Sequence, residues 1–590
     1  MTLVSPAEIQ SQSTEAGKGL FARLPFDPFT AISGAVVIGS CAIVLGLVGV
    51  VGWLSLVEGL PGDAGKALTL ANYHKVFEDP FVLTVLWNTL QFCFATLVVA
   101  MPLGLIGAWL VERTDFSGKT VVLSLMSIGL LIPGFASAMG WLYLLHPRIG
   151  VVNTWLRDLF GLVEAPFNIM TIAGMGWVQG LSLAPLIFVM TAAVFRAMDP
   201  SLEEAASTHG VKTWRVMMKV TLPLAWPGIL AAAIYVFVIG FAAFDVPAVL
   251  GWGNRIFTFS TFLLSVINGS EGLPRYGLGA ALSAVVIVIA ALLGYLYSLM
   301  QRKAHRYTVV TGKAYKPKLI ELGRWNIAAW IGVVLYFSFS KLVPLVLLVY
   351  ASLLPFFQFP SLRAFKAMSL SNYYSVPWGL ATEALGHTLI LMFLTPTITL
   401  AISVAFSWIV LKTRAPGRKT ADFIAFLPHA VPNVIFGIGA LLAALYLLQS
   451  FIPIYGTIWL ILLVFVVARL SYGTRMTNSG LIQIHKELEE AAQISGATGF
   501  GTFRSVILPL LSPTLMYAWL WIALLTYREL TLAVVVSSSG NVTLPVVVWS
   551  LWSSGGLGRA SALAVISMLL VVPLIVVYWF IAKRRGALAA

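Results

Sequence analysis

One polar loop occurs twice in this chain, and its residue types suit docking to a partner. The first copy has two acids, two alanines, a glycine, an aromatic residue and a Leu-Pro-Leu segment: Glu203, Glu204, Ala205, Ala206, Gly210, Trp214 and 222–224. The second copy repeats these types 286 residues later (489 − 203) without a gap: Glu489, Glu490, Ala491, Ala492, Gly496, Phe500 and 508–510. A fixed-offset match of this kind indicates an internal duplication.

Each loop is expected to form two short helices joined by a turn. Glutamate and alanine favour helix, and acidic residues suit the positive end of the helix dipole. Gly210 and Gly496 supply the left-handed residue that ends the first helix. A second short helix is expected from Val211 to Val220, ended by Pro223. The product is an amphipathic helix-turn-helix that could lie in a groove on a partner; for one copy alone, a helix on the membrane surface is the alternative.

The composition places these loops in a membrane protein. The chain has 590 residues, of which 59% are hydrophobic and only 10% charged, whereas ordinary domains carry about 25% charged residues. Apolar runs long enough to cross a bilayer, roughly 20 residues, recur along the chain. The expected spans are 31–57, 83–111, 120–146, 169–197, 228–252, 276–300, 326–354, 386–412, 422–449, 456–476, 514–539 and 560–582. We therefore predict an all-α integral membrane protein of about 12 transmembrane helices, arranged as two tandem six-helix repeats of the same orientation.

The net charge of +14 is concentrated in three short segments that flank apolar runs: 302–325, 412–419 and 583–585. This is the pattern of cytoplasmic loops, so it argues against a nucleic-acid partner and predicts cytoplasmic N- and C-termini. The two cysteines, Cys41 and Cys93, fall inside apolar runs, which excludes a disulfide framework. The predicted organisation is a tail, a first half, a basic linker, a second half and a second tail: 1–30, 31–301, 302–325, 326–582 and 583–590.

The duplication extends beyond the loops. Residues 70–73 match 370–373, and a proline interrupts the third span of each half at equivalent positions, Pro133 and Pro432. Two halves with an even number of spans share one orientation, so an axis along the membrane normal should relate them, with a pathway between them. The interruptions could be gates or plain kinks, since such breaks are tolerated where protein or a cavity satisfies the backbone.

Ionisable residues within apolar runs are candidates for this pathway. Asp245, Tyr527 and Glu529 offer hard oxygen donors that suit a hard cation. Arg528, together with Arg469 and Arg275, offers contacts to an anion instead. Structural contacts between helices remain an equal alternative for Asp245 and for the Arg528/Glu529 pair. No metal-ligand spacing and no clustered catalytic constellation occurs, so neither a metal site nor a catalytic site is predicted.

The loop pattern resembles the coupling loop of ABC-importer permeases of the binding-protein-dependent type, and the resemblance covers essentially the whole chain as two fused permease halves. It implies a bacterial inner-membrane subunit in which Glu204 and Glu490 contact a separate ATPase and Gly210 and Gly496 make the turn. No phosphate-binding Gly-x4-Gly-Lys-Ser/Thr loop occurs in the chain. The resemblance therefore implies two copies of an ATPase subunit and an external substrate-binding protein, with no cofactor in this chain.

Three stretches are similar to the iron(III)-transport subgroup: 244–251, 307–317 and 528–530. Related thiamine, polyamine and phosphonate permeases share parts of them, so these cargoes stay open. A secondary transporter built from six-span repeats is the main alternative class, but it would need no paired docking loops. A membrane-embedded enzyme is disfavoured because no catalytic cluster lies at membrane depth.

Overall fold

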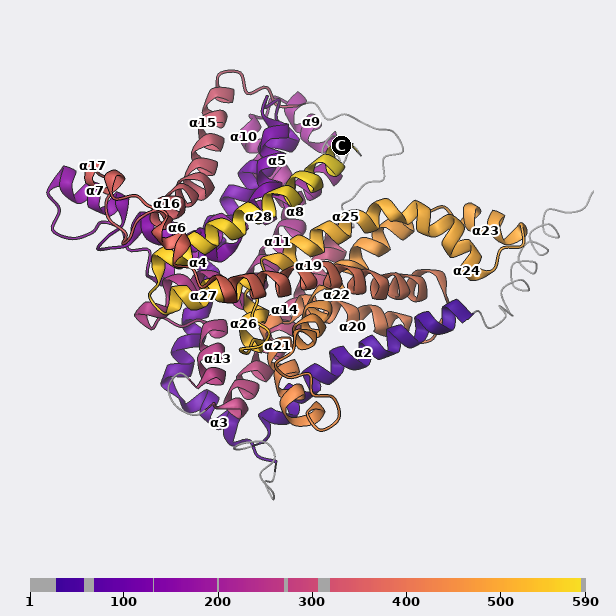
Figure 1. Cartoon of the computed structure of the whole chain (residues 1–590). Coiled ribbons are helices and arrows are strands. Elements are labelled where there is room, and N and C mark those ends of the chain that lie inside the picture. Colours follow the sequence, from indigo (N-terminus) through magenta and orange to yellow (C-terminus); the bar gives the residue numbers. More distant parts are fainter. Residues whose placement is uncertain are drawn as a thin grey trace, which may run out of the picture.

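The computed structural model describes residues 28–57, 68–130, 132–198, 201–269, 274–305 and 319–584, and these residues are mostly helical (Figure 1). The first half contains α2 (Pro28–Ser55), α3 (Ala71–Glu78), α4 (Pro80–Arg113), α5 (Lys119–Gly129), α6 (Gly134–Leu145), α7 (Val151–Phe160), α8 (Ile172–Ala197), α9 (Ser201–Thr208), α10 (Thr213–Val216), α11 (Leu222–Ala242), α12 (Asp245–Leu250), α13 (Phe259–Asn268) and α14 (Tyr276–His305). The second half contains α15 (Trp325–Phe337), α16 (Val343–Ser352), α17 (Leu362–Lys366), α18 (Ser371–Tyr374), α19 (Trp378–Ser407), α20 (Arg418–Ala430), α21 (Asn433–Ala443), α22 (Ile458–Ile482), α23 (Lys486–Ile494), α24 (Gly499–Thr502), α25 (Leu508–Tyr527), α26 (Thr531–Val536), α27 (Leu544–Ser553) and α28 (Leu557–Arg584). Most of the predicted tails and of the basic linker lies outside the described residues.

The long helices confirm the predicted membrane architecture. Within the described ranges, ten helices are long and apolar enough to cross a membrane, or up to twelve if each of two bent pairs forms one span. The bent pairs are α5 with α6 and α20 with α21, each with a bend of 100°. The bends occur just before Pro133 and Pro432, because proline disfavours helix in the residue before it.

The two halves repeat the same side-chain contacts, as the match of 70–73 with 370–373 predicts. Asn72 donates hydrogen bonds of 3.2 and 2.8 Å to two carbonyls at the end of the first span. Asn372 donates bonds of 3.0 and 2.6 Å to the equivalent carbonyls of the second half. The neighbouring Tyr73 and Tyr373 each meet a serine hydroxyl at 2.8 Å. These shared hydrogen bonds show that the duplication is structural as well as sequential.

The first span of each half crosses over to pack on the other half. Helix α2 packs on α20 and α21 as well as on α14, and α16 packs on α6 as well as on α28 (Figure 1). Glycine permits both crossings. A Cβ atom on Gly140 would overlap the carbonyl of Pro344, and one on Gly439 would lie 2.5 Å from the carbonyl oxygen of Leu47. The two halves are therefore interlocked and share one apolar core.

The halves differ most in the connection between their third and fourth spans. The offset between equivalent positions falls from 299 (432 − 133) to 286 (489 − 203), so this connection is 13 residues longer in the first half. The extra length includes α7, which packs on α6 at one corner of the molecule (Figure 1). The helices of the duplicated loops, α9 and α10 with α23 and α24, lie at the side of the molecule opposite α3 and α13 (Figure 1).

Candidate coupling loops and central charged cluster

Each duplicated loop ends its first helix in the same hydrogen-bonded turn. Gly210 has φ +74° and Gly496 has φ +84°, in the left-handed region that glycine adopts without strain. The N–H of Gly210 donates to the carbonyl of Ser207 at 3.0 Å, and the following N–H donates to the carbonyl of Ala206 at 3.3 Å. The second copy repeats both bonds, at 2.9 and 3.0 Å, with the latter accepted by Ala492. This paired pattern is the Schellman motif, which satisfies the free carbonyls at a helix end.

The prediction that the second helix of the loop is short and ends at Pro223 is wrong. Helix α10 passes through a π turn, Met217–Thr221, into α11, and the segment Trp214–Ala242 runs as one span. Pro223 does not end a helix: it follows the π turn in the first residues of α11, and the helix continues through it. Pro509 occupies the same place in α25. Each loop is thus a short helix and a turn that lead directly into the fifth span of its half.

The first glutamate of each loop binds a basic residue of its own half. The Glu203 carboxylate lies 3.2 Å from Arg113 Nε, and Arg113 is buried at the end of α4. Glu489 forms the equivalent ion pair with Lys412, at the end of the second span of the other half. Arg113 and Lys412 are themselves equivalent positions (412 − 113 = 299). These pairs hold each loop helix against the membrane-spanning body.

The rest of each loop helix presents a matched apolar surface. Leu202 and Leu488 are equivalent and exposed, and so are the aromatic residues Trp214 and Phe500. Ala205 and Ala491 are exposed between them, while Ala206 and Ala492 are partly covered. Glu490 is exposed, and Glu204 is half-buried and in contact with neighbours. The structure therefore distinguishes the two glutamates of each motif: the first forms the inward ion pair in both loops, and in the second loop the second glutamate is exposed.

We expect Arg113→Met to loosen the first loop, because the Glu203 carboxylate would lose its charged partner beneath the helix. An unsatisfied buried group of this kind costs about 1–3 kcal/mol. Hydrogen exchange of the amides in 203–211 should accelerate by about ten-fold or more.

The matched control is Arg196→Met. Arg196 also pairs with a glutamate nearby, Glu112, at 2.7 Å, but it is 52% exposed. A pair this exposed contributes only about 0–1 kcal/mol. Equal acceleration by the two substitutions would contradict the role given to Arg113.

A second group of charged residues meets at the broken third span of the first half. Arg528, which follows α25, donates hydrogen bonds to the carbonyls of Leu130 and Ile132 on either side of the break. Asp245 begins α12 and lies against the start of α6, where a Cβ on Gly134 would come within 2.6 Å of its carboxylate. Arg528 belongs to the second half and Leu130 to the first, so this contact closes the interface between the halves.

Glu529 lies in the same cluster but is already paired. It forms an ion pair with Arg469 of α22 and accepts a hydrogen bond of 3.2 Å from the N–H of Leu532. Asp245, Glu529 and Arg469 are all charged neighbours of Arg528. Tyr527 is placed differently, since its hydroxyl is buried and donates to the carbonyl of Ser567 in α28 at 2.8 Å. Of the four predicted pathway residues, three are therefore brought together and Tyr527 is directed elsewhere.

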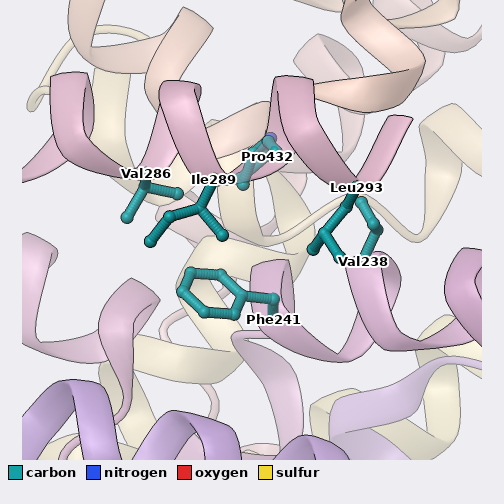
Figure 2. Close-up of a pocket in the computed structure, with 7 residues that line it drawn as sticks. Val238, Phe241, Val286, Ile289, Leu293 and Pro432 are labelled. Atoms are coloured by element: carbon teal, nitrogen blue, oxygen red, sulfur yellow. The ribbon is translucent and has the colours of Figure 1, made fainter. Parts of the chain in front are cut away.

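The break in the second half lies mainly among aromatic and apolar side chains instead. The ring of Tyr235 in α11 stacks on His429 in α20, with centroids 4.7 Å apart. Beside it, Pro432 lines a small cavity of about 10 Å³ together with Phe241, Ile289 and other apolar side chains of α11 and α14 (Figure 2). Ala242 is equivalent to Arg528 (528 − 286 = 242), so the first half has no arginine at the equivalent position. The two breaks are related by the duplication but differ in chemistry.

Sequence reasoning missed three basic residues that the structure places at these sites: Arg113, Lys412 and Lys341. The first two could have been found as equivalent basic residues, each next to a matched threonine. Lys341 could have been found as a lone lysine inside a long apolar run. Among the described residues, no group of three or more His, Cys, Asp or Glu side chains could hold a metal ion.

Comparison with known proteins agrees with this duplicated architecture. Residues 100–306 and 397–586 each match the family described as "Binding-protein-dependent transport system inner membrane component". A ferric transport system permease protein, FbpB, of Actinobacillus pleuropneumoniae is 25% identical over 75% of this chain, which corresponds to 63% of that protein. An Fe(3+)-transport system permease protein of Haemophilus influenzae is 22% identical over 83% of this chain and 88% of that protein.

A shorter relative matches only part of the chain. The putative 2-aminoethylphosphonate transport system permease protein PhnV of Salmonella typhimurium is 29% identical over 38% of this chain and 82% of its own length. The two family matches lie on the two helical halves, and each includes one loop and one broken span. The chain belongs to the binding-protein-dependent family of inner-membrane transport permeases, with two units of that family in tandem.

Proposed function

We propose that this protein is the membrane-spanning subunit of an ATP-driven importer. Its two halves would enclose the translocation pathway, and its two loops would couple that pathway to two copies of a separate ABC ATPase subunit. One observation carries this proposal: both loops have the same glycine turn, the same inward ion pair and the same exposed leucine and aromatic residue. Two identical docking surfaces suit two identical partners.

The loop surface indicates how docking would work. An amphipathic helix binds in a groove through its apolar residues, here Leu202 and Trp214 in one loop and Leu488 and Phe500 in the other. Ala205 and Ala491 allow close approach, and Glu204 and Glu490 would contact the ATPase. Because α10 and α24 continue into the fifth spans, closure of the ATPase pair would move those spans directly.

The orientation follows from the same assignment. The loops, the basic linker 302–325 and both termini would lie in the cytoplasm, as the positive-inside rule favours. The side that carries α3 and α13 would face outward and receive cargo from a substrate-binding protein. The chain would cycle between inward-open and outward-open states as the halves move.

Iron(III) is the cargo that we propose. The iron-transport relatives align across both halves, whereas the phosphonate relative aligns with 38% of the chain. Phosphonate is the second candidate because of that relative; thiamine and polyamines belong to the same class of importer. A secondary transporter is a weaker alternative, since it would have no use for two matched docking loops.

The cargo is tested by uptake of radiolabelled iron(III) in a strain that lacks this protein. Restoring the wild-type chain should restore uptake well above the background of the deletion strain. Flat iron uptake with the protein correctly inserted would reject iron as cargo, and parallel assays with labelled 2-aminoethylphosphonate, thiamine and polyamines would then identify the transported class.

A further inference from the structure

Two basic side chains converge on the end of α5, at the break between α5 and α6. Arg528 reaches it through the carbonyl of Leu130. Lys341, in the middle of the span formed by α15 and α16, is only 8% exposed, and its Cε lies 3.6 Å from the position of a Cβ on Gly129. Gly129 and Leu130 are adjacent, and Arg528 is a charged neighbour of Lys341. Two like charges thus approach the same turn at membrane depth.

The acidic residues of the cluster do not balance these charges. Glu529 is occupied by its ion pair with Arg469. Asp245 is then the remaining carboxylate beside Arg528, and neither it nor Lys341 forms an ion pair with another described residue. Three cations face two carboxylates, which leaves one positive charge in excess. The C-terminal end of α5 offsets only about half a charge.

The charged groups also retain accessible surface within the interface. Asp245 and Arg528 are both of intermediate exposure, although they lie at the break between α5 and α6. An uncompensated cation at membrane depth is costly, so the retention of both Arg528 and Lys341 at one break favours an anionic ligand. A bare trivalent cation would instead meet net repulsion here, with only two carboxylates near it.

We propose that Arg528 and Lys341 form an intramembrane binding site for a small oxyanion, at the break between α5 and α6. The oxyanion would enter either alone or as a ligand on iron(III). In this arrangement Arg528 would leave the carbonyls of Leu130 and Ile132 to bind the anion as a planar, bidentate donor, and Lys341 would supply a second point charge. The inference rests on the proposed importer function and specifies that the transported cargo is, or carries, an anion.

The test is equilibrium binding to the purified full-length chain in lipid nanodiscs, without ATPase, ATP or binding protein. The probes are radiolabelled inorganic phosphate and, separately, a preformed complex of iron(III) with pyrophosphate. Wild-type protein should bind at least one of them saturably. Arg528→Gln and Lys341→Met should each weaken that binding by about ten-fold or more, while Arg528→Lys should retain part of it. Phosphate binding would indicate a free oxyanion, and binding of the iron complex alone would indicate an anion carried on the metal.

The matched control is Arg475→Gln. Arg475 lies on α22, near Arg469 in sequence, but is 47% exposed and pairs with Asp422, so this substitution should leave binding unchanged. Size-exclusion profiles of each variant establish that it is folded. Absence of binding to both probes by the wild type, or an equal loss in Arg475→Gln, would overturn the proposal. Because the assay contains no ATPase, either result leaves the coupling proposal standing, and a protein uncoupled at its loops should still bind the anion.

Discussion

Replacing Gly210 and Gly496 together with valine is expected to abolish the ATP-dependent iron uptake that we propose for this protein, while the protein remains in the membrane. Both glycines have positive φ, and a Cβ at either position would meet no atom within 4 Å. The effect is therefore one of backbone conformation, since a left-handed L-residue costs roughly 1–2 kcal/mol and more when it is β-branched. Strain in both turns should displace both docking helices and lower uptake at least ten-fold, measured with radiolabelled iron(III) and normalised to the amount of inserted protein.

The chain offers a matched control in Gly161 and Gly555. They too have positive φ and open space around a Cβ, but they lie outside the duplicated loops. The double valine variant at these positions carries similar strain and should retain uptake. Undiminished uptake in the Gly210/Gly496 variant would contradict the assignment of these loops to coupling.

Charge reversal at the exposed Glu490 should reduce recovery of the ATPase with the purified protein.

The second large effect is expected where the first spans cross between halves. Alanine at Gly140 and Gly439 would force a Cβ against the backbone of α16 and of α2 respectively. Backbone cannot move aside as a flexible side chain can, and overpacking of this kind costs about 1–3 kcal/mol per site. The double variant should therefore show a clearly lower unfolding temperature in detergent, followed by tryptophan fluorescence.

Alanine at Gly332 and Gly386 is expected to have the opposite effect on stability. Both lie within helices, α15 and α19, and a Cβ at either position meets nothing within 4 Å. Alanine there should leave stability unchanged or raise it, since glycine in a helix is less favourable than alanine by about 0.5–1 kcal/mol. A similar loss of stability in both pairs would show that the crossing is not closely packed.

The helical membrane fold could be predicted because its signals are local. Apolar runs of bilayer length, prolines at equivalent breaks and a repeated acidic loop can all be read without knowing which segments touch. The turn at Gly210 was predictable for the same reason, since helix termination by a left-handed glycine depends on neighbouring residues alone. The helix end at Pro223 was predicted wrongly, because a π turn directly before the proline lets the helix continue through it.

The sequence by itself determined that this is a duplicated membrane protein with two matched loops, because apolar periodicity and repeat spacing can be read along the linear sequence. Only the tertiary structure decided what each charge in those segments contacts. Glu203 and Glu204 are adjacent and chemically alike, yet Arg113, 90 residues away (203 − 113), selects the first for an inward ion pair. Arg528 likewise reaches Leu130 across 398 residues. Pairings of this range depend on how the two halves interlock. The physical reason is that a buried charge is costly unless it is paired, and tertiary packing decides which partner lies within reach.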